Sequence, residues 1–197
     1  MSGNCYKARL LLSLLGRDYE RIAVDLRGRE NRSPEHLRMN PRGQVPVLVD
    51  GEVTVWDSQA VIVCIARRYG SADWLPIEPT AMAEVMQWLA FSENEVLYGL
   101  ARARAIEVFG RPWSMEEAQA TGRAGLAVLE SHLESHDWLA LGRPTIADIA
   151  CFPYVALAPE GGVGLDDCPA VRAWIGRIKS LPGYIGMPGI EPQSAFA

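Results

Sequence analysis

The chain has 197 residues, of which 49% are hydrophobic and 22% are charged, and its formal net charge is −5. This composition excludes a disordered chain and fits one soluble globular domain or two small ones. The acidic balance argues against a nucleic-acid or anionic-membrane partner, and the sequence has no apolar run of about 18 residues that could span a bilayer. The first residues lack the apolar stretch of a signal peptide, so we expect a cytoplasmic protein.

Charge is distributed unevenly along the chain. Residues 1–76 carry 11 Lys and Arg against 9 Asp and Glu, whereas the remainder carries 8 against 15. We therefore expect the first part to bind any anionic small ligand. The four cysteines are scattered without a Cys-x-x-Cys pair, so the sequence indicates neither a disulfide framework nor a zinc site, and we expect no bound metal.

Helix and strand signals alternate over the first part. The expected elements are a helix over 6–15, strands over 19–26, 45–49 and 53–56, an arginine-rich loop with a short helix over 27–42, and a helix over 60–68. Gly16 follows the first helix, and Asp50-Gly51 is a hairpin signal between the last two strands. Asp57 and Ser58 stand where the N-cap of the next helix belongs. This order predicts an α/β unit.

The composition changes after Tyr69. Residues 70–79 form a linker with two prolines, and strand signals nearly vanish beyond it. Apolar residues then recur at helical spacing over four segments, namely 81–109, 115–133, 146–157 and 171–181. We expect an α/β domain over residues 1–76 and an all-helical domain over residues 80–197.

Three local features could carry chemistry, and the first is a hydroxyl, an amide and a thiol at the start of the first helix. Ser2, Asn4 and Cys5 stand at or just before that helix N-terminus. Free N–H groups and the positive end of the helix dipole stabilise an anion there, including a thiolate. A plain helix cap explains the same residues when they are taken alone.

The second feature is Pro46 at the head of a strand, in the run Gln44-Val45-Pro46. Proline cannot donate to a strand ladder, so its position needs an explanation. With a cis peptide bond, the N–H and C=O of Val45 would face outward and could pair with the backbone of a small peptide. A trans proline at a sheet edge is the alternative.

The third feature is Asp57-Ser58, between a strand and a helix. Ser58 and the N–H groups behind it can hold a carboxylate, while Asp57 can accept a hydrogen bond from an ammonium group. Together they could receive the zwitterionic end of a peptide. A simple N-cap is again the alternative.

Taken in order, these features resemble a known family. The most specific runs are Asn-Pro-Arg-Gly-Gln-Val-Pro-Val-Leu over residues 40–48, Asp57-Ser58, and Pro-Thr-Ile-Ala-Asp over residues 144–148. They resemble the cytosolic glutathione S-transferases, in particular serine-type bacterial members similar to the zeta, theta and nu classes. The resemblance covers nearly the whole chain and implies a thioredoxin-like α/β domain followed by an all-α domain.

The resemblance also implies a glutathione site. The backbone of Val45, ahead of a cis Pro46, would pair with the cysteinyl unit of glutathione. Asp57 and Ser58 would bind the γ-glutamyl group, with Gln44 nearby. The arginine-rich segment of residues 27–42 would attract the glycyl carboxylate.

Ser2 aligns with the serine that stabilises the glutathione thiolate in the serine-type classes. Asn4 matches an asparagine used by a bacterial class with disulfide-reductase activity, and Cys5 lies one residue past the cysteine of the beta class. Thr145 and Asp148 match the buried capping box of the family, whose role is structural.

The resemblance places the electrophile pocket between the domains. Trp88, Phe91 and Tyr98 could face it, although core or dimer-interface roles fit these residues equally well.

The function implied is that of a glutathione transferase, which stabilises the thiolate of glutathione for attack on a hydrophobic electrophile. Alternatives within the family are maleylacetoacetate isomerisation and glutathione-dependent disulfide reduction. An alternative from another class is a non-catalytic protein that binds partners or ligands. The resemblance further implies a homodimer, a role in detoxification, and glutathione as co-substrate without a metal.

One departure from the family pattern concerns the first strand. The first domain of the family begins with an apolar strand before the serine, and this sequence has none there. Because that strand is central in the sheet, its neighbours would lose their ladder partners. We therefore expect that the natural protein starts about ten residues earlier, enough for one strand, and that Met1 is an internal methionine. Otherwise another segment fills the place, or the domain is damaged.

Overall fold

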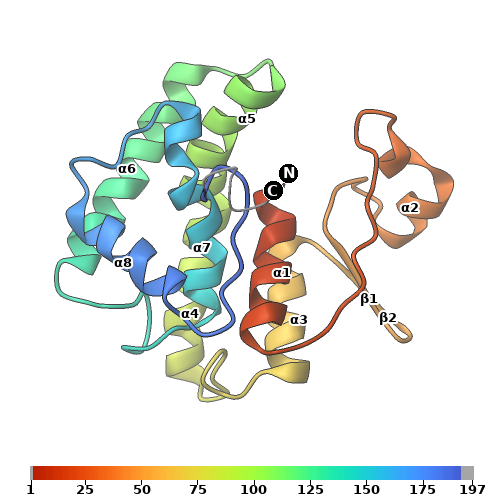
Figure 1. The fold of residues 1–197 in the computed structure, drawn as a ribbon, viewed down its shortest axis with the longest axis horizontal. Coiled ribbons are helices and arrows are strands. Elements are labelled where there is room, and N and C mark those ends of the chain that lie inside the picture. The colour runs from red at the N-terminus through yellow and green to blue at the C-terminus, as the bar shows by residue number, and fades with distance from the viewer. Residues whose placement is uncertain (1, 192–197) are drawn as a thin grey trace.

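The computed structural model describes residues 2–191, and an α/β part precedes an all-helical part as expected (Figure 1). The first part contains α1 (Gly3–Leu14), η1 (Glu30–Arg32), α2 (Pro34–Met39), β1 (Val47–Asp50), β2 (Val53–Trp56) and α3 (Ser58–Tyr69). The second contains α4 (Pro79–Phe91), η2 (Ser92–Ala101), α5 (Arg102–Phe109), α6 (Met115–Leu133), α7 (Ile146–Ala156), η3 (Ala158–Gly161) and α8 (Pro169–Lys179). No helix in the described residues is long and apolar enough to cross a membrane.

Helix α1 begins earlier than the apolar run predicts, because Ser2 caps it. Ser2 has extended backbone angles, and its Oγ accepts a hydrogen bond from the N–H of Cys5 at 3.4 Å. The apolar face of α1 packs against α3 and against α7, so α1 lies between the two parts of the molecule. The β1–β2 hairpin and α2 lie on the other side of α1 and α3 (Figure 1).

The strand predicted over residues 19–26 is wrong. Residues 17–25 have no regular structure, and the backbone of residues 18–24 pairs with no neighbouring strand in the described part of the chain. A strand is stable only where a neighbour supplies the other half of its hydrogen bonds. In the described residues β1 and β2 pair only with each other, antiparallel, with Val47 opposite Trp56. Ile22 is consequently 78% exposed.

The long helix predicted from residue 81 is present but is not α-helical throughout. Helices α4, η2 and α5 follow one another without a break, since the residues at both junctions, Ser92 and Arg102, keep helical backbone angles. The middle segment η2 is a π-helix, a form that is rare and often found at functional sites. Helix α6 packs closely on η2, because Gly99 has no Cβ to strike the backbone of Gly122.

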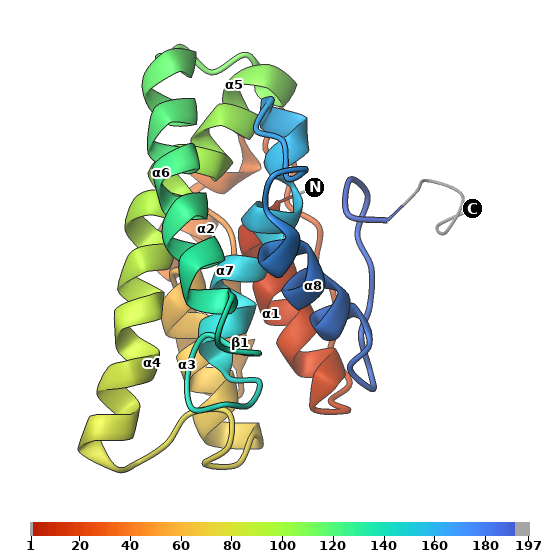
Figure 2. The ribbon, with the colours of Figure 1, turned by 90° about the vertical axis from the view of Figure 1, so that its left-hand side faces the viewer.

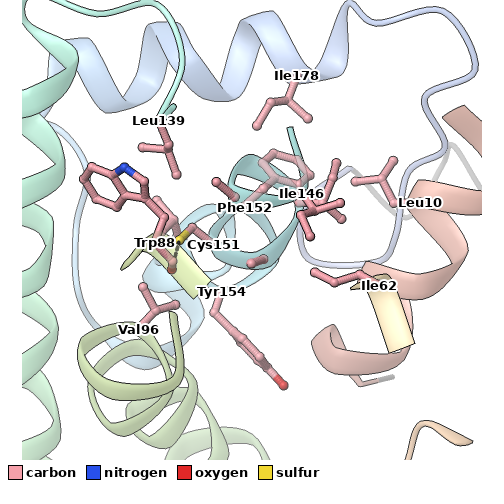
Figure 3. Packing of buried hydrophobic residues seen from close by; sticks show 14 of the residues in the cluster. Leu10, Ile62, Trp88, Val96, Leu139, Ile146, Cys151, Phe152, Tyr154 and Ile178 are labelled. Atoms are coloured by element: carbon pink, nitrogen blue, oxygen red, sulfur yellow. Dashed lines mark hydrogen bonds between the residues drawn. The ribbon is translucent and has the colours of Figure 1, made fainter. Parts of the chain in front are cut away.

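Helix α7 is the centre of the molecule. It contacts α1, α3, α4 and α8, and in Figure 2 α4 and α6 lie to one side of it and α1 and α8 to the other. Figure 3 shows its Phe152 among side chains from both parts, including Leu10 of α1 and Ile62 of α3. One hydrophobic core therefore joins the α/β part to the helical part.

A buried carboxylate anchors the start of α7. Asp148 has no exposed surface and accepts hydrogen bonds from the backbone N–H of Thr145 at 2.9 Å and of Leu139 at 3.1 Å. It also accepts one from Nε1 of Trp174 in α8 at 2.9 Å, and Thr145 caps the helix in return. Burial raises the pKa of Asp148 to about 6, although these donors favour the ionised form. The capping box thus ties α7, α8 and the preceding loop together.

We expect Asp148→Ala to lower the free energy of unfolding by at least about 3 kcal/mol, because three buried N–H groups lose their acceptor. Urea unfolding followed by circular dichroism measures this loss. Thr145→Ser, which keeps the capping hydroxyl, serves as the control and should cost about 1 kcal/mol for the lost methyl group. Equal stability of the Asp148→Ala variant and the wild-type protein would contradict the role given to this carboxylate.

Candidate active site

An open cavity of about 860 Å³ lies between the two parts and is called the cavity below. Its lining from the first part consists of Ser2, Cys5 and Arg9, residues 21–27, and Val45. Its lining from the helical part consists of Ala101, Arg104, Ala105, Val108, Phe109, Arg111 and Tyr154. The N-terminus of α1 therefore opens on a space whose other wall is α5 and α7.

The cavity is positively charged. Five arginines from three segments line it, namely Arg9, Arg21, Arg27, Arg104 and Arg111. Asp25 is the one acidic residue among the lining residues. Arg104 is buried, and its guanidinium is held by an ion pair with Glu160. A concave surface with this excess of positive charge concentrates anions.

Val45 reaches the cavity through a loop that is fixed by buried polar side chains. The Val45–Pro46 peptide bond is cis, as one reading of the sequence predicts. Asn40, which is 1% exposed, donates from Nδ2 to the carbonyl of Gln44 at 2.7 Å and accepts from the N–H of Arg42 at 3.0 Å. The backbone of residues 40–46 is therefore held in place, while the Gln44 side chain is exposed.

Asp57 adopts a backbone conformation that few residues other than glycine tolerate, with φ of 76°. Its Oδ1 accepts from the N–H of Gln59 at 2.9 Å and caps α3, and its Oδ2 lies 3.2 Å from Nη1 of Arg42. Ser58 follows it, buried, in the first turn of α3. The N-cap predicted at Asp57-Ser58 is therefore present at Asp57, but neither residue lines the cavity.

A buried polar cluster connects this corner to the helical part. Lys7 is 1% exposed, and its Nζ lies 3.5 Å from Oγ of Ser58, 3.4 Å from Oγ of Ser92 and 3.9 Å from Oε1 of Glu93. Gln59 donates from Nε2 to Ser92 and Glu93, at 3.1 and 2.8 Å. Burial lowers the pKa of Lys7, whereas the Glu93 carboxylate favours its charged form.

The remaining candidates at the start of α1 differ in their surroundings. Asn4 does not line the cavity, and its Oδ1 is buried without a hydrogen-bond partner in the described structure. Cys5 does line it, but burial raises the pKa of its thiol, which favours the protonated form over the thiolate. Of the three, Ser2 is the one that both lines the cavity and carries a hydroxyl at the N-cap of α1.

Comparisons with known proteins decide the family. The glutathione S-transferase N-terminal domain matches residues 1–67, and the C-terminal domain of the same family matches residues 112–177. A maleylacetoacetate isomerase of Pseudomonas aeruginosa is 31% identical over 208 residues, which cover 100% of this chain and 96% of that protein. The chain belongs to the glutathione S-transferase family.

Other relatives extend the likeness. The disulfide-bond oxidoreductase YfcG of Escherichia coli is 30% identical over 189 residues, which cover 91% of this transferase-family chain and 87% of that protein. A solved glutathione S-transferase from Pseudomonas fluorescens is 33% identical with a TM-score of 0.88, over 95% of this chain and 94% of that one. A glutathione transferase homologue from Drosophila mojavensis, solved with bound glutathione, is 25% identical with a TM-score of 0.83. The match covers 92% of this chain and 84% of that one.

The three aromatic residues that the sequence predicts for an electrophile pocket, Trp88, Phe91 and Tyr98, do not line the cavity. Trp88 is 7% exposed and packs edge-on against Phe91 in the core, and Tyr98 is half exposed with Arg102 over its ring. The wider turns of η2 change which side chains share a face, so a spacing of three and four residues does not hold beyond Ser92. The cavity wall comes instead from α5 and from Tyr154 of α7.

Sequence reasoning missed two residues at this site, and each has a signal in the sequence. Lys7 is a lone cation within an apolar run, and Tyr154 is a polar-tipped residue in a helix whose other residues from Ile146 to Val155 are buried. Both signals have meaning only once α1 and α7 are known to pack together.

We expect Asp57→Ala to lower the free energy of unfolding by about 1 to 2 kcal/mol, because the α3 cap is lost and alanine tolerates the positive φ poorly. Asp57→Asn keeps an oxygen that can cap α3 and tolerates this conformation, so it should stay within about 0.5 kcal/mol of the wild-type protein. Urea unfolding of both variants measures the difference. Equal losses in the two variants would show that neither cap nor backbone conformation matters at this position.

Proposed function

We propose that this member of the glutathione S-transferase family is a glutathione transferase, which couples glutathione to a hydrophobic electrophile. The observation that carries the proposal is that Ser2, at the N-terminus of α1, and Val45, beside a cis proline, line one positively charged cavity. The bound glutathione of the Drosophila mojavensis homologue adds support from a relative.

In this proposal glutathione binds along the first part of the chain. The backbone N–H and C=O of Val45 pair with the cysteinyl unit, and Asp57 with Ser58 binds the γ-glutamyl end, with Gln44 nearby. The Lys7 ammonium, 3.5 Å from Ser58, adds a positive charge beside the γ-glutamyl carboxylate. The cavity arginines attract the glycyl carboxylate.

The chemistry follows from the position of the sulfur at the helix N-terminus. The thiol loses its proton to solvent, and the Ser2 hydroxyl and the α1 dipole stabilise the resulting thiolate. The sulfur lone pair forms a C–S bond with the electrophile, and the leaving group departs with the bonding pair. The apolar residues Ala101, Ala105 and Phe109 give the electrophile a wall to pack against.

Two other activities within the family remain as candidates. Isomerisation of maleylacetoacetate is favoured by the 31% identity to a curated isomerase, and disulfide reduction by Asn4 and the 30% identity to a disulfide-bond oxidoreductase. We also propose a cytoplasmic homodimer with a role in detoxification, on the resemblance to the family alone. Analytical ultracentrifugation tests the dimer.

Binding to immobilised glutathione is the first test. The folded protein should be retained and should elute with free glutathione. Failure to bind would overturn the transferase, isomerase and reductase proposals together and leave a partner-binding role. If the protein binds, assays with a chlorinated nitrobenzene, maleylacetone and a glutathione mixed disulfide distinguish the three reactions.

We expect Ser2→Ala to lower kcat/KM for the chlorinated nitrobenzene about a hundredfold, because one hydrogen-bond donor to the developing charge is lost. The Kd for glutathione, measured by calorimetry, should change less than about twofold, since binding rests mainly on other groups. Asn4→Ala is the matched comparison and should have a small effect on this reaction. A larger loss in Asn4→Ala than in Ser2→Ala would transfer the activating role to Asn4.

We expect the KM for glutathione to rise several-fold as sodium chloride increases, because salt screens the attraction between the cavity arginines and the glutathione carboxylates. Steady-state kinetics at constant pH measure this dependence. The KM for an uncharged electrophile should change little over the same range. A glutathione KM that does not depend on salt would show that these arginines do not bind it.

A further inference from the structure

Tyr154 joins the helical part to the start of α1. It lies in α7, nine residues after the cap residue Thr145, and Figure 3 shows its ring pointing away from the core with the hydroxyl outermost. The residue is 9% exposed and lines the cavity together with Ser2. A phenol from one part of the chain therefore meets the candidate thiol activator of the other.

The ring of Tyr154 is held in place from two sides. It lies against Gly3, where a Cβ atom would stand 2.8 Å from both Cε1 and Cζ of the ring. The buried Nζ of Lys7 lies 5.8 Å from the ring centroid. Only glycine leaves room for the tyrosine at this position, so Gly3 and Tyr154 form a matched pair beside Ser2.

The hydroxyl of Tyr154 sits among groups of the α1 N-terminus. The ring carbon that carries it, Cζ, packs against Gly3, which stands between Ser2 and Asn4. The neighbouring Asn4 N–H, Ser2 hydroxyl and Arg104 charge favour the ionised phenolate. Burial is the larger effect and raises the pKa of Tyr154, so the phenol keeps its proton and acts as a donor. The phenol proton is therefore available to an acceptor near the start of α1, and Ser2 lines the same cavity.

We propose that Tyr154 is a positioning residue for Ser2. The Ser2 oxygen accepts from the Cys5 N–H at 3.4 Å. In this proposal it also accepts from the hydroxyl of Tyr154, which lines the same cavity, so the Ser2 proton is directed toward the glutathione sulfur. The inference rests on the proposed function, because it assigns a partner to the residue that stabilises the thiolate. The α/β part supplies the donor, and the helical part orients it.

The test is a double-mutant comparison with the pKa of bound glutathione as readout. The ultraviolet absorbance of the thiolate is titrated in the wild-type protein, Tyr154→Phe, Ser2→Ala and the double variant, each saturated with glutathione. Tyr154→Phe should raise the pKa of the bound thiol by about half a pH unit, which is roughly a threefold loss of thiolate below that pKa. In the Ser2→Ala background the same change should have no further effect, because Tyr154 acts through Ser2.

Two results would overturn the inference: an unchanged thiol pKa in Tyr154→Phe, or an equal shift in both backgrounds. The second would mean that the phenol acts on the sulfur directly or only on the structure. The Kd for glutathione is measured in parallel by calorimetry. If the proposed function is wrong, the wild-type protein does not bind glutathione; if only this inference is wrong, the wild-type protein still binds it.

Tyr98→Phe is the matched control, since it removes a hydroxyl from a half-exposed tyrosine outside the cavity, and it should leave the thiol pKa unchanged. Should Tyr154→Phe fail to fold, Gly3→Ala decides the question. The added methyl group pushes the Tyr154 ring aside while Ser2 and the phenol both remain. It should raise the thiol pKa in the same direction, and an unchanged pKa would overturn the inference.

Discussion

The packing of α7 against both parts of the molecule depends on the desolvated carboxylate of Asp148. This group collects backbone N–H donors from Leu139 and Thr145 and the indole of Trp174, and so fixes where α7 starts and how it is rotated. Rotation matters because the ring of Tyr154, almost two turns further on, occupies the space that a Cβ on Gly3 would need. A buried acid that is not among the residues lining the cavity therefore helps to determine the geometry of its wall.

The two parts meet through apolar side chains and several hydrogen bonds, and one corner of the contact buries a charged side chain. There, the Lys7 ammonium lies within 3.5 Å of the hydroxyl groups of Ser58 and Ser92 and 3.9 Å from the Glu93 carboxylate. Burying a lysine costs its hydration energy, and the contacts here offset only part of that cost, so the charge lowers the free energy of unfolding. Its retention is understandable if the charge serves an anionic ligand at Ser58. On that view the corner resembles a binding site that is completed when glutathione brings its carboxylate.

The sequence was most informative where local chemistry decides structure. The runs at residues 40–48 and 144–148, with Asp57-Ser58, were enough to predict the fold class and the family, because turns, caps and a strand-leading proline depend on near neighbours. The strand at 19–26 failed because pairing requires a partner far along the chain. The facing of Tyr98 could not be predicted from α-helical spacing because it lies in a π-helix. Lys7 and Tyr154 were missed because only the packing of α1 on α7 brings them together.

The π-helical segment has a consequence for how such a protein can change. A single helix, from Pro79 to Phe109, carries Ser92 and Glu93 of the polar cluster near its middle and Arg104 and Phe109 of the cavity wall near its end. The number of residues per turn in η2 determines the angle about the helix axis between the polar-cluster residues and the cavity-wall residues. Loss of one residue from η2 beyond Glu93 would rotate everything after it about the helix axis and present different side chains to the cavity, while Ser92 and Glu93 stayed in place. Insertions and deletions in this segment, more than substitutions, therefore change which side chains of α5 line the cavity.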